Sequence, residues 1–494
     1  MHKRINSALI SVYHKDGLDA IASALQSNQA TIYSTGGTMS YINKLGITVE
    51  PVESLTGYPS ILDGRVKTLH PKVFGGILAR RQDDHQKQLA EYDIPEIDLV
   101  VVDLYPFEQT LADTDDENVL IEKIDIGGIA LLRAAAKNYK DVLVVSSREQ
   151  YAEVAQLLKN PNGIDDVTRK RFAGKAFQRS SAYDTAIGGW LSDHETSLRY
   201  GENPHQSATF SGDLSEIFDK IQGKELSYNN LVDVDSAINL MAEFKDDEPT
   251  FAVIKHTNAC GLATRSTVLE AWHSALAGDP ISAFGGILIC NQTIDKATAE
   301  EINKLFFEVL IAPDFSVEAL EIFASKKKRV IIQLNIYPNQ KNAVKTCLNG
   351  TIKQDYDDPM YLADQLKTVS KKVITDREMD DLKFAYKSVK HLKSNGISIV
   401  KNKQLIGMGC GQTSRIDALK QAILKARQFG FDLSESVMAS DAFFPFPDCV
   451  EIAHNVGISA VIQPGGSIKD QDSIDFCDSH NMAMMTTGMR HFKH

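Results

Sequence analysis

The sequence predicts an α/β protein built mainly on parallel sheets. Short apolar runs alternate with helical stretches along most of the chain, and polar or glycine-rich segments follow directly after several of these runs. Short apolar strands separated by helices are typical of parallel sheets that are covered on both faces. Because the 494 residues exceed one ordinary hydrophobic core, we expect more than one domain.

The first part of the chain is predicted to form one such sheet. Its expected strands are Ala8–Tyr13, Thr31–Ser34, Asp98–Leu104 and Asp141–Val145. Helices are expected at Leu18–Leu25 and over the long stretch from Asp166 to Leu191. We place the main boundary near residue 195, so that the domains cover residues 1–195 and 196–494.

The second part returns to the same alternation and carries a weak internal duplication. Its expected strands are Phe251–Ile254, Gly286–Ile289, Glu308–Ala312, Arg329–Leu334, Ile397–Val400, Leu405–Met408, Ala460–Gln463 and Ala483–Thr486. Residues 251–313 and 397–464 each contain a strand, a helix, an Ala-Phe turn and a final strand that ends in proline. The polar stretch from Asn339 to Asp376 is predicted to be an irregular linker or surface excursion.

Composition excludes several classes of protein. Hydrophobic residues make up 43% and charged residues 24%, which fits a globular protein, and the formal net charge is −12. This acidic balance argues against a nucleic-acid or membrane-surface binder, although a local basic pocket still allows small anionic ligands. No apolar run is long enough to cross a bilayer or to form a signal peptide. The six cysteines include no C-x-x-C pair, which favours scattered thiols in a cytoplasmic protein over disulfides or zinc.

The most informative segment is Phe251–His256. Four apolar residues predict a buried strand, and Lys255 and His256 follow at its carboxyl end, where open α/β sheets bind ligands. Histidine exchanges protons near neutral pH, and lysine holds negative charge or donates a proton. Taken alone, the pair is better explained as two surface polar residues at a strand end than as a site.

Three motifs of the first domain suggest an anion site. Residues 31–38 form a strand, a glycine turn and a helix start, which suits phosphate but is also explained as a tight turn capped by Thr38. Residues 63–71 gather two cations and a histidine in a loop that acts as an anion clamp or is simply solvated. Asp125 precedes a glycine-opened helix that ends in Lys137, and Tyr105 closes a buried strand.

The second domain carries further polar motifs. The loop 198–206 is rich in hydrogen-bonding side chains, and such loops are usually held by what they bind. Residues 393–395 precede a strand and residues 407–415 precede a helix, and the C-terminus from Arg490 is basic. The phenylalanine-rich turn 440–446 is explained by core packing or by an aromatic wall for a flat heterocycle.

Taken in order from Ala8 to His494, these motifs closely resemble one family, the bifunctional purine-biosynthesis enzymes that join AICAR transformylase to IMP cyclohydrolase. The resemblance implies a cyclohydrolase domain with a methylglyoxal-synthase-like parallel sheet (core about residues 1–146), followed by a transformylase with two cytidine-deaminase-like subdomains. The deaminase zinc signature is absent, so no zinc is expected. The implied ligands are AICAR, formyl-AICAR, IMP and the co-substrate 10-formyltetrahydrofolate. The family forms an intertwined homodimer with transformylase sites across the interface, and a bound monovalent cation is left open.

The resemblance also implies roles in formyl transfer. The AICAR amino group is a poor nucleophile, so its attack on the formyl carbon needs a base and an oxyanion donor. By resemblance, His256 handles the amine proton, Lys255 stabilises charge or protonates the leaving folate nitrogen, and Asn395 orients the formyl oxygen or His256. Arg199 and Arg490 match residues that hold the AICAR phosphate. Other substrate or folate contacts are Tyr200, Asn230, Phe284, Gly285, Arg415, Phe443, Pro445, Phe446 and Asp448.

For ring closure the resemblance implies acid–base chemistry without a metal. The catalytic groups would be Lys67, Tyr105, Asp125 and Lys137. The nucleotide would be held by Lys15, Ser34, Thr35, Gly36, Arg65 and Thr68.

Departures from the family pattern concentrate in the first domain. Tyr13-His14 replace the usual Ser-Asp, Asp103 replaces an asparagine, and Ile129 replaces a proline, while Ala259 and Pro447 depart in the second domain. Asp103 places negative charge near the reacting carboxamide, so we expect cyclohydrolase activity to survive in a weakened form or with a shifted pH optimum. Two other hypotheses are a transformylase whose first domain only binds nucleotide, and a non-catalytic nucleotide sensor.

Overall fold

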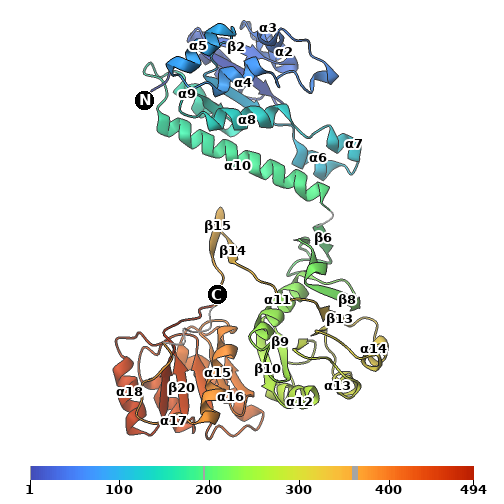
Figure 1. Cartoon of the computed structure of the whole chain (residues 1–494), viewed down its shortest axis with the longest axis vertical. Coiled ribbons are helices and arrows are strands. Elements are labelled where there is room, and N and C mark those ends of the chain that lie inside the picture. Colours follow the sequence, from blue (N-terminus) through green and yellow to red (C-terminus); the bar gives the residue numbers. More distant parts are fainter. Residues whose placement is uncertain (1, 193–194, 359–364) are drawn as a thin grey trace. The chain divides into compact units, whose positions relative to one another are not determined.

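The computed structural model describes residues 2–192, 195–358 and 365–494. Its contacts divide the chain into two compact units, Met1–Glu195 (unit 1) and Thr196–His494 (unit 2) (Figure 1). Within the described residues, no helix has both the length and the apolar character needed to cross a membrane.

Unit 1 is built on one five-stranded sheet with the order β3-β2-β1-β4-β5. Its strands are β1 (Ser7–Val12), β2 (Thr31–Ser34), β3 (Glu50–Pro51), β4 (Leu99–Asp103) and β5 (Leu143–Val145). All four pairings are parallel, which confirms the predicted parallel sheet. The two-residue strand β3 was not predicted, because so short an edge strand has no apolar run of its own.

Helices cover both faces of this sheet. They are α1 (Leu18–Ser27), α2 (Gly36–Lys44), α3 (Val52–Thr56), α4 (Pro71–Leu78), α5 (Asp83–Glu91), α6 (Phe107–Asp113), α7 (Glu117–Ile121), α8 (Gly127–Lys137), α9 (Tyr151–Leu157) and α10 (Asp166–Leu191). One core lies between the sheet and α1 and α9, and the other lies between the sheet and α4, α8 and α10. This double cover explains why the residues of β4 are apolar on both faces.

Unit 2 contains two six-stranded sheets that repeat one topology. The first has the order β10-β9-β11-β12-β13-β8 and the second the order β18-β17-β19-β20-β21-β16, written here in the same sense. The first consists of β8 (Phe218–Gln222), β9 (Thr250–Lys255), β10 (Asn258–Thr264), β11 (Ile287–Cys290), β12 (Val309–Ala312) and β13 (Val330–Leu334). The second consists of β16 (Lys367–Thr368), β17 (Ile397–Val400), β18 (Leu405–Gly409), β19 (Val437–Ser440), β20 (Ala460–Gln463) and β21 (Ala483–Thr486). The predicted internal duplication is therefore confirmed.

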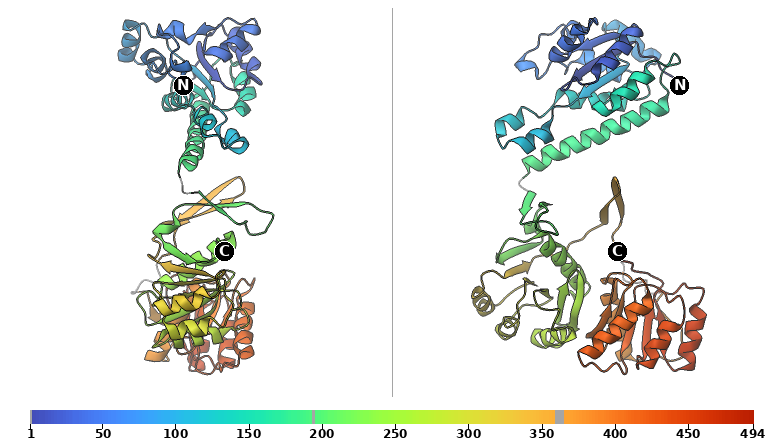
Figure 2. Two further views of the ribbon diagram at one scale, coloured as in Figure 1. Left: turned by 90° about the vertical axis from the view of Figure 1, so that its right-hand side faces the viewer. Right: turned by 180° about the vertical axis from the view of Figure 1, so that it is seen from behind.

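The helices of unit 2 follow the same repeat. The first half has α11 (Tyr228–Ala242), α12 (Val268–Gly278), α13 (Lys296–Ile302) and α14 (Val317–Ala324), and the second has α15 (Asp376–Lys390), α16 (Arg415–Gln428), α17 (Asp448–Asn455) and α18 (Asp470–Ser479). Residues of α11, α15 and both sheets form one shared core, and the other helices cover the outer faces (Figure 2). Phe244 and Phe384 meet in that core with ring centroids 5.2 Å apart.

The stretch from Asn339 to Asp376 is not irregular as predicted. It contains an antiparallel hairpin of β14 (Asn342–Cys347) and β15 (Gly350–Asp355), together with β16 of the second sheet. Most side chains of this hairpin are exposed on both faces, so the segment lacks the apolar alternation that marks a strand. A second two-stranded sheet, β6 (Glu195–Leu198) with β7 (Ala208–Ser211), also lacked this signal.

Candidate active sites

The carboxyl edge of the unit 1 sheet gathers most of the residues predicted for ring closure. Lys15 follows β1, Ser34 ends β2, and Tyr105 follows β4, and these three strands are neighbours in the sheet. Because carboxyl ends of parallel strands share one edge, these side chains are brought to one place, where α/β sheets bind their ligands.

The glycine turn after β2 presents the start of a helix. The Ser34 hydroxyl donates to the Ile10 carbonyl at 2.7 Å, and the Thr35 hydroxyl lies 3.2 Å from that of Ser11. Thr38 does not cap the helix, because its hydroxyl bonds the backbone of Val12, and no side chain caps α2 among the described residues. The Thr38 amide donates to the Thr35 carbonyl at 3.0 Å, so the amides of Gly36 and Gly37, the first two of α2, are those available to an anion.

The loop of residues 64–70 contacts the N-termini of two helices. A Cβ atom on Gly36, at the start of α2, would lie 3.5 Å from the Lys67 ammonium, and one on Gly127, at the start of α8, would lie 2.8 Å from the Thr68 hydroxyl. Arg65 forms an ion pair with Glu122. The loop therefore places a cation and a hydroxyl beside two helix N-termini, as the anion-clamp hypothesis requires.

Asp125 lies two residues before α8 and is partly buried. Its carboxylate accepts a hydrogen bond of 2.6 Å from the Gly128 amide. Burial raises the pKa of this carboxyl, and the negative charge of Asp103 raises it further. A carboxylate with a raised pKa is a better proton acceptor near neutral pH.

Tyr183 of α10 holds the Asp125 backbone and was missed by the sequence analysis. Its hydroxyl donates to the Lys123 carbonyl at 2.6 Å and accepts from the Asp125 amide at 2.9 Å. Nothing in the local sequence marks this residue, because its partners come from a segment about 60 positions earlier.

Lys137 is not brought to the other predicted catalytic groups of unit 1. It is the last residue of α8, so it lies about 15 Å along the helix axis from Gly127. There it lines a groove with Phe74, Arg133 and Phe177.

In unit 2, Lys255 and His256 lie at the β9–β10 hairpin turn. The Lys255 ammonium donates to the carbonyls of Phe284 and Gly285, at 3.0 and 3.2 Å. The Phe284 ring is 62% exposed and so is available for a contact outside the chain. The structure thus gathers four predicted site residues, of which His256 and Phe284 are exposed.

The N-terminus of α11 brings Arg199, Tyr200 and Asn230 to the same half of unit 2. The Tyr200 carbonyl accepts from the Tyr228 amide at 3.3 Å, and the Arg199 guanidinium lies 4.7 Å from the centre of the Tyr200 ring. Asn230 is buried and forms a capping box with Ser227, so it also has a structural role.

A second group of polar residues surrounds Arg415. Its guanidinium donates to the Asn395 side-chain oxygen at 2.7 Å, to the Asp441 carboxylate at 2.9 Å and to the Phe443 carbonyl at 3.2 Å. Asp441 is fully buried and also accepts from the Ser394 hydroxyl at 2.6 Å. Asp448 was predicted as a site residue and Asp441 was not, because Asp441 follows β19, a strand that was not predicted. Asp448 begins α17, and its carboxylate accepts from the Cys449 amide at 2.8 Å.

The C-terminal segment is attached to this group. The His491 amide donates to the Asp441 carbonyl at 3.0 Å, while Ser394 and Lys493 exchange two hydrogen bonds. Arg490, which is exposed, directly precedes the attached His491 in the chain. Pro445 and Phe446 are exposed on the loop after β19.

The group around Lys255 and His256 and the group around Arg415 lie next to each other in unit 2. The Lys393 amide donates to the Asn258 side chain at 3.2 Å, which links the loop of Asn395 to the turn of His256. Within the described residues, no three His, Cys, Asp or Glu side chains are placed to hold a metal ion.

Comparison with known proteins decides the family. A family model described as "AICARFT/IMPCHase bienzyme" matches residues 135–425, which is more than half of the chain, and one described as "MGS-like domain" matches residues 17–130. The chain belongs to the AICARFT/IMPCHase bienzyme family. The resemblance stated from the sequence is thereby confirmed.

Full-length relatives of this bienzyme chain agree. A "Bifunctional purine biosynthesis protein PurH" of Bacteroides thetaiotaomicron is 55% identical over 505 residues, covering 100% of this chain and 99% of the relative. Proteins of the same name from Acetivibrio thermocellus and Aquifex aeolicus are each 45% identical, covering 99% of this chain and 100% of each relative. A solved structure titled "Crystal structure of ForH" is 35% identical and covers 38% of this chain and 98% of that chain, with a TM-score of 0.34.

Two departures of this bienzyme chain from the family pattern form a pair. The His14 imidazole lies 2.9 Å from the Asp103 carboxylate, and the His14 amide donates to the same oxygen at 2.8 Å. The resemblance implies an aspartate and an asparagine at these two positions, where this chain has His14 and Asp103. Asp103 therefore has a hydrogen-bonding partner in His14, and its expected effect on ring closure stays a prediction.

We expect Asp103→Asn to move the acid limb of the ring-closure pH profile to lower pH. The charge of Asp103 raises the pKa of Asp125, so its removal lowers that pKa, and the basic form of Asp125 persists at lower pH. The rate of IMP formation from formyl-AICAR, measured across pH, checks this. The double variant His14→Asp/Asp103→Asn restores the usual pair and serves as the control, and superimposable profiles for wild type and Asp103→Asn would contradict the prediction.

Proposed function

We propose that this chain catalyses two consecutive steps of purine biosynthesis. Unit 2 transfers the formyl group of 10-formyltetrahydrofolate to AICAR, and unit 1 closes formyl-AICAR to IMP with loss of water. The observation that carries the proposal is that each unit of this bienzyme-family chain has its own group of proton-transfer and anion-binding residues, at a sheet edge in unit 1 and at a hairpin turn in unit 2.

For formyl transfer, the exposed His256 accepts the proton of the AICAR amine as its nitrogen attacks the formyl carbon. Lys255, adjacent in sequence, stabilises the oxyanion and protonates the folate nitrogen as its bond to the formyl carbon breaks. Asn395 orients the formyl oxygen, because both ends of its side-chain amide are held. Its oxygen accepts from Arg415, and its nitrogen donates to the Gln412 carbonyl at 2.9 Å. The phosphate lies with Arg199 and Arg490. The folate and purine rings are held by Tyr200, Asn230, Phe284, Gly285, Phe443, Pro445, Phe446 and Asp448.

For ring closure, the carboxamide nitrogen attacks the formyl carbon, and the former formyl oxygen leaves as water. Asp125 accepts the proton of the attacking nitrogen, and Lys67 and Tyr105 protonate the oxygen. As water leaves, the former formamide nitrogen gives its proton back to one of these two donors. The amides of α2 bind the phosphate together with Thr35, Gly36 and Thr68. Lys15, Ser34 and Arg65 complete the nucleotide site, and we assign no proton-transfer step to Lys137, given its place at the far end of α8.

We also propose that the active form is a cytoplasmic homodimer without zinc. The exposed rings of Phe284 and Phe446, 62% and 55% exposed, support a partner surface at the transformylase groups. Light scattering in solution is expected to give twice the mass of one chain, and the mass of a single chain would contradict the dimer. Whether a monovalent cation binds is checked by assaying formyl transfer with potassium and without it.

The decisive assay separates the two activities. Wild type is expected to convert AICAR and 10-formyltetrahydrofolate to IMP, whereas Lys67→Met should stop at formyl-AICAR, because the cation beside the helix N-termini is gone. Chromatography of the nucleotide products measures both steps. Accumulation of formyl-AICAR by wild type would favour a transformylase with an inactive first unit, and binding of AICAR without turnover would favour a nucleotide sensor.

A further inference from the structure

The turn that carries His256 has an unusual backbone. His256 and Thr257 have φ values of 48° and 63°, and they join β9 to β10 between the paired residues Lys255 and Asn258. Two-residue hairpins with positive φ at both positions favour asparagine and glycine, and a β-branched residue such as threonine is rare there. This conformation therefore has to be held by its surroundings.

Asp233 of α11 holds this turn in its conformation. Its carboxylate accepts a hydrogen bond of 2.7 Å from the Thr257 amide. Ser236, one helical turn further, donates its hydroxyl to the Thr257 carbonyl at 2.9 Å. The carboxylate thus fixes the two residues whose backbone sets the direction of the His256 side chain.

The second half of unit 2 repeats this arrangement. Asn402 and Lys403, in the β17–β18 turn, have φ values of 52° and 51°. The Asp381 carboxylate accepts their amides at 2.9 and 2.6 Å. Asp233 and Asp381 are each the sixth residue of their helices, α11 and α15, so the same device occurs at the same place in both halves.

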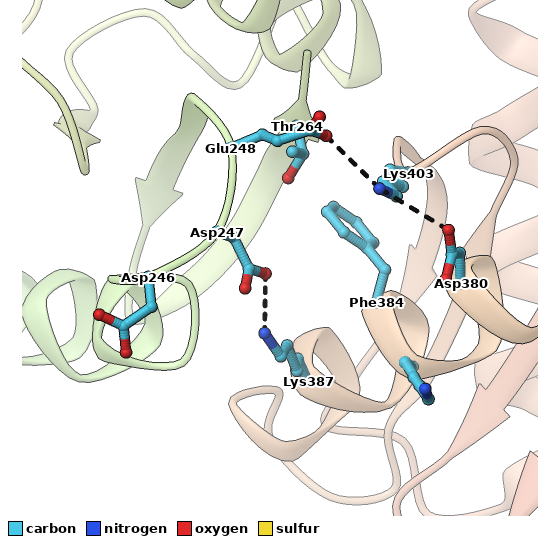
Figure 3. Close-up of a pocket in the computed structure, with 9 residues that line it drawn as sticks. Asp246, Asp247, Glu248, Thr264, Asp380, Phe384, Lys387 and Lys403 are labelled. Atoms are coloured by element: carbon cyan, nitrogen blue, oxygen red, sulfur yellow. Dashed lines mark hydrogen bonds and ion pairs between the residues drawn. The ribbon is translucent and has the colours of Figure 1, made fainter. Parts of the chain in front are cut away.

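The two turns differ in what their side chains do. In the second half, Lys403 reaches Glu248 and Asp380, at 3.5 and 3.8 Å, beside a cavity of about 460 Å³ (Figure 3). Lys387 and Asp247 form another ion pair there, at 2.7 Å. In the first half, the His256 imidazole is exposed and makes no hydrogen bond or ion pair with any residue that the structure describes. The Lys403 side chain therefore connects its turn to neighbouring residues, whereas the His256 side chain remains available to bind a substrate.

We propose that Asp233 is a positioning residue for formyl transfer, because its carboxylate fixes the His256–Thr257 turn and so aims the imidazole at the substrate amine. Asp381 is its structural counterpart and has no part in the reaction. This inference rests on the proposed transformylase function of unit 2.

The first test is Asp233→Asn. Asparagine replaces one carboxylate oxygen by an NH2 donor and removes the negative charge, so it holds the Thr257 N–H group less firmly than the carboxylate does. We expect kcat for formyl transfer to fall by about 10²-fold, as for a slightly misplaced catalytic group, while KM for AICAR and the rate of ring closure in unit 1 stay close to wild type. Asp233→Glu, which keeps the charge but moves it by one methylene, is expected to lose transfer as well and answers the question if Asp233→Asn does not fold.

A rescue separates positioning from general stability. In Asp233→Asn/Thr257→Gly, glycine adopts the positive φ without help, so most of the lost kcat should return. The matched control is Asp381→Asn, which is expected to lower the unfolding temperature but to leave kcat of the folded enzyme unchanged.

These experiments distinguish failure of the positioning role from failure of the proposed function. Wild-type kcat in Asp233→Asn, an equal loss in Asp381→Asn, or no recovery with Thr257→Gly would overturn the positioning role while the transformylase function stands. Absence of formyl transfer in wild type would overturn the proposed function and this inference together.

Discussion

His256→Ala is expected to lower kcat for formyl transfer by about 10²- to 10⁴-fold, the usual contribution of a positioned acid–base group. The exposed imidazole is the proton acceptor that we assign to the AICAR amine, and alanine cannot replace it. Ring closure of added formyl-AICAR should proceed at the wild-type rate, because unit 1 has its own catalytic groups. Separate assays of the two steps with one enzyme preparation measure both rates.

The control for this variant is His273→Ala. His273 is an exposed histidine on α12 of the same half and takes no part in either group of site residues. Its loss should leave both steps unchanged. If His256→Ala kept its transfer rate, another residue would have to be the base and the proposed mechanism would be wrong.

Arg415→Met is expected to destabilise unit 2 by about 3–5 kcal/mol, because it leaves the fully buried Asp441 carboxylate without its cation. It also removes the donor that fixes Asn395, so formyl transfer should fall even where the protein remains folded. Urea unfolding of unit 2, followed together with the transfer rate, measures both effects.

A double variant distinguishes stability from chemistry in this prediction. Arg415→Met/Asp441→Leu replaces the buried pair by apolar groups, so it should regain most of the lost stability but none of the lost transfer. Arg427→Ala, an exposed arginine on the same helix, is the control and should change neither quantity. A double variant as unstable as Arg415→Met would show that the unpaired charge is not the cause.

Much of the fold was predictable because its central strands carry strong local signals. The apolar residues of β4 and β9 are buried on both faces and need no partner to be recognised. The β14–β15 hairpin and β10 were missed for opposite reasons. The hairpin has no buried face. In β10 the run of apolar residues is interrupted by Gly261, where the backbone of Ala275 lies too close to leave room for a side chain.

The sequence suggests candidate site residues one at a time, but it does not show which of them lie together in the fold. Lys255 and His256 stood out because they directly follow an apolar strand. Asp233 and Asp441 did not, since each acts on residues more than 20 positions away and only the tertiary fold brings them together. Lys137 stays a prediction, because a motif match names a residue without showing which end of a helix it occupies.

The repeated sheet of unit 2 has a consequence for how the chain tolerates mutation. Duplication and fusion of a single ancestral segment would produce two halves with the same strand order. After such a duplication, only one of the two copies has to keep its catalytic residues. Position 256 is then constrained by reactivity. Position 403, which follows Asn402 (the counterpart of His256) in the second turn, is constrained by its positive φ and by the ion pairs of its side chain. Saturation libraries should accept arginine readily at 403 and no substitute at 256.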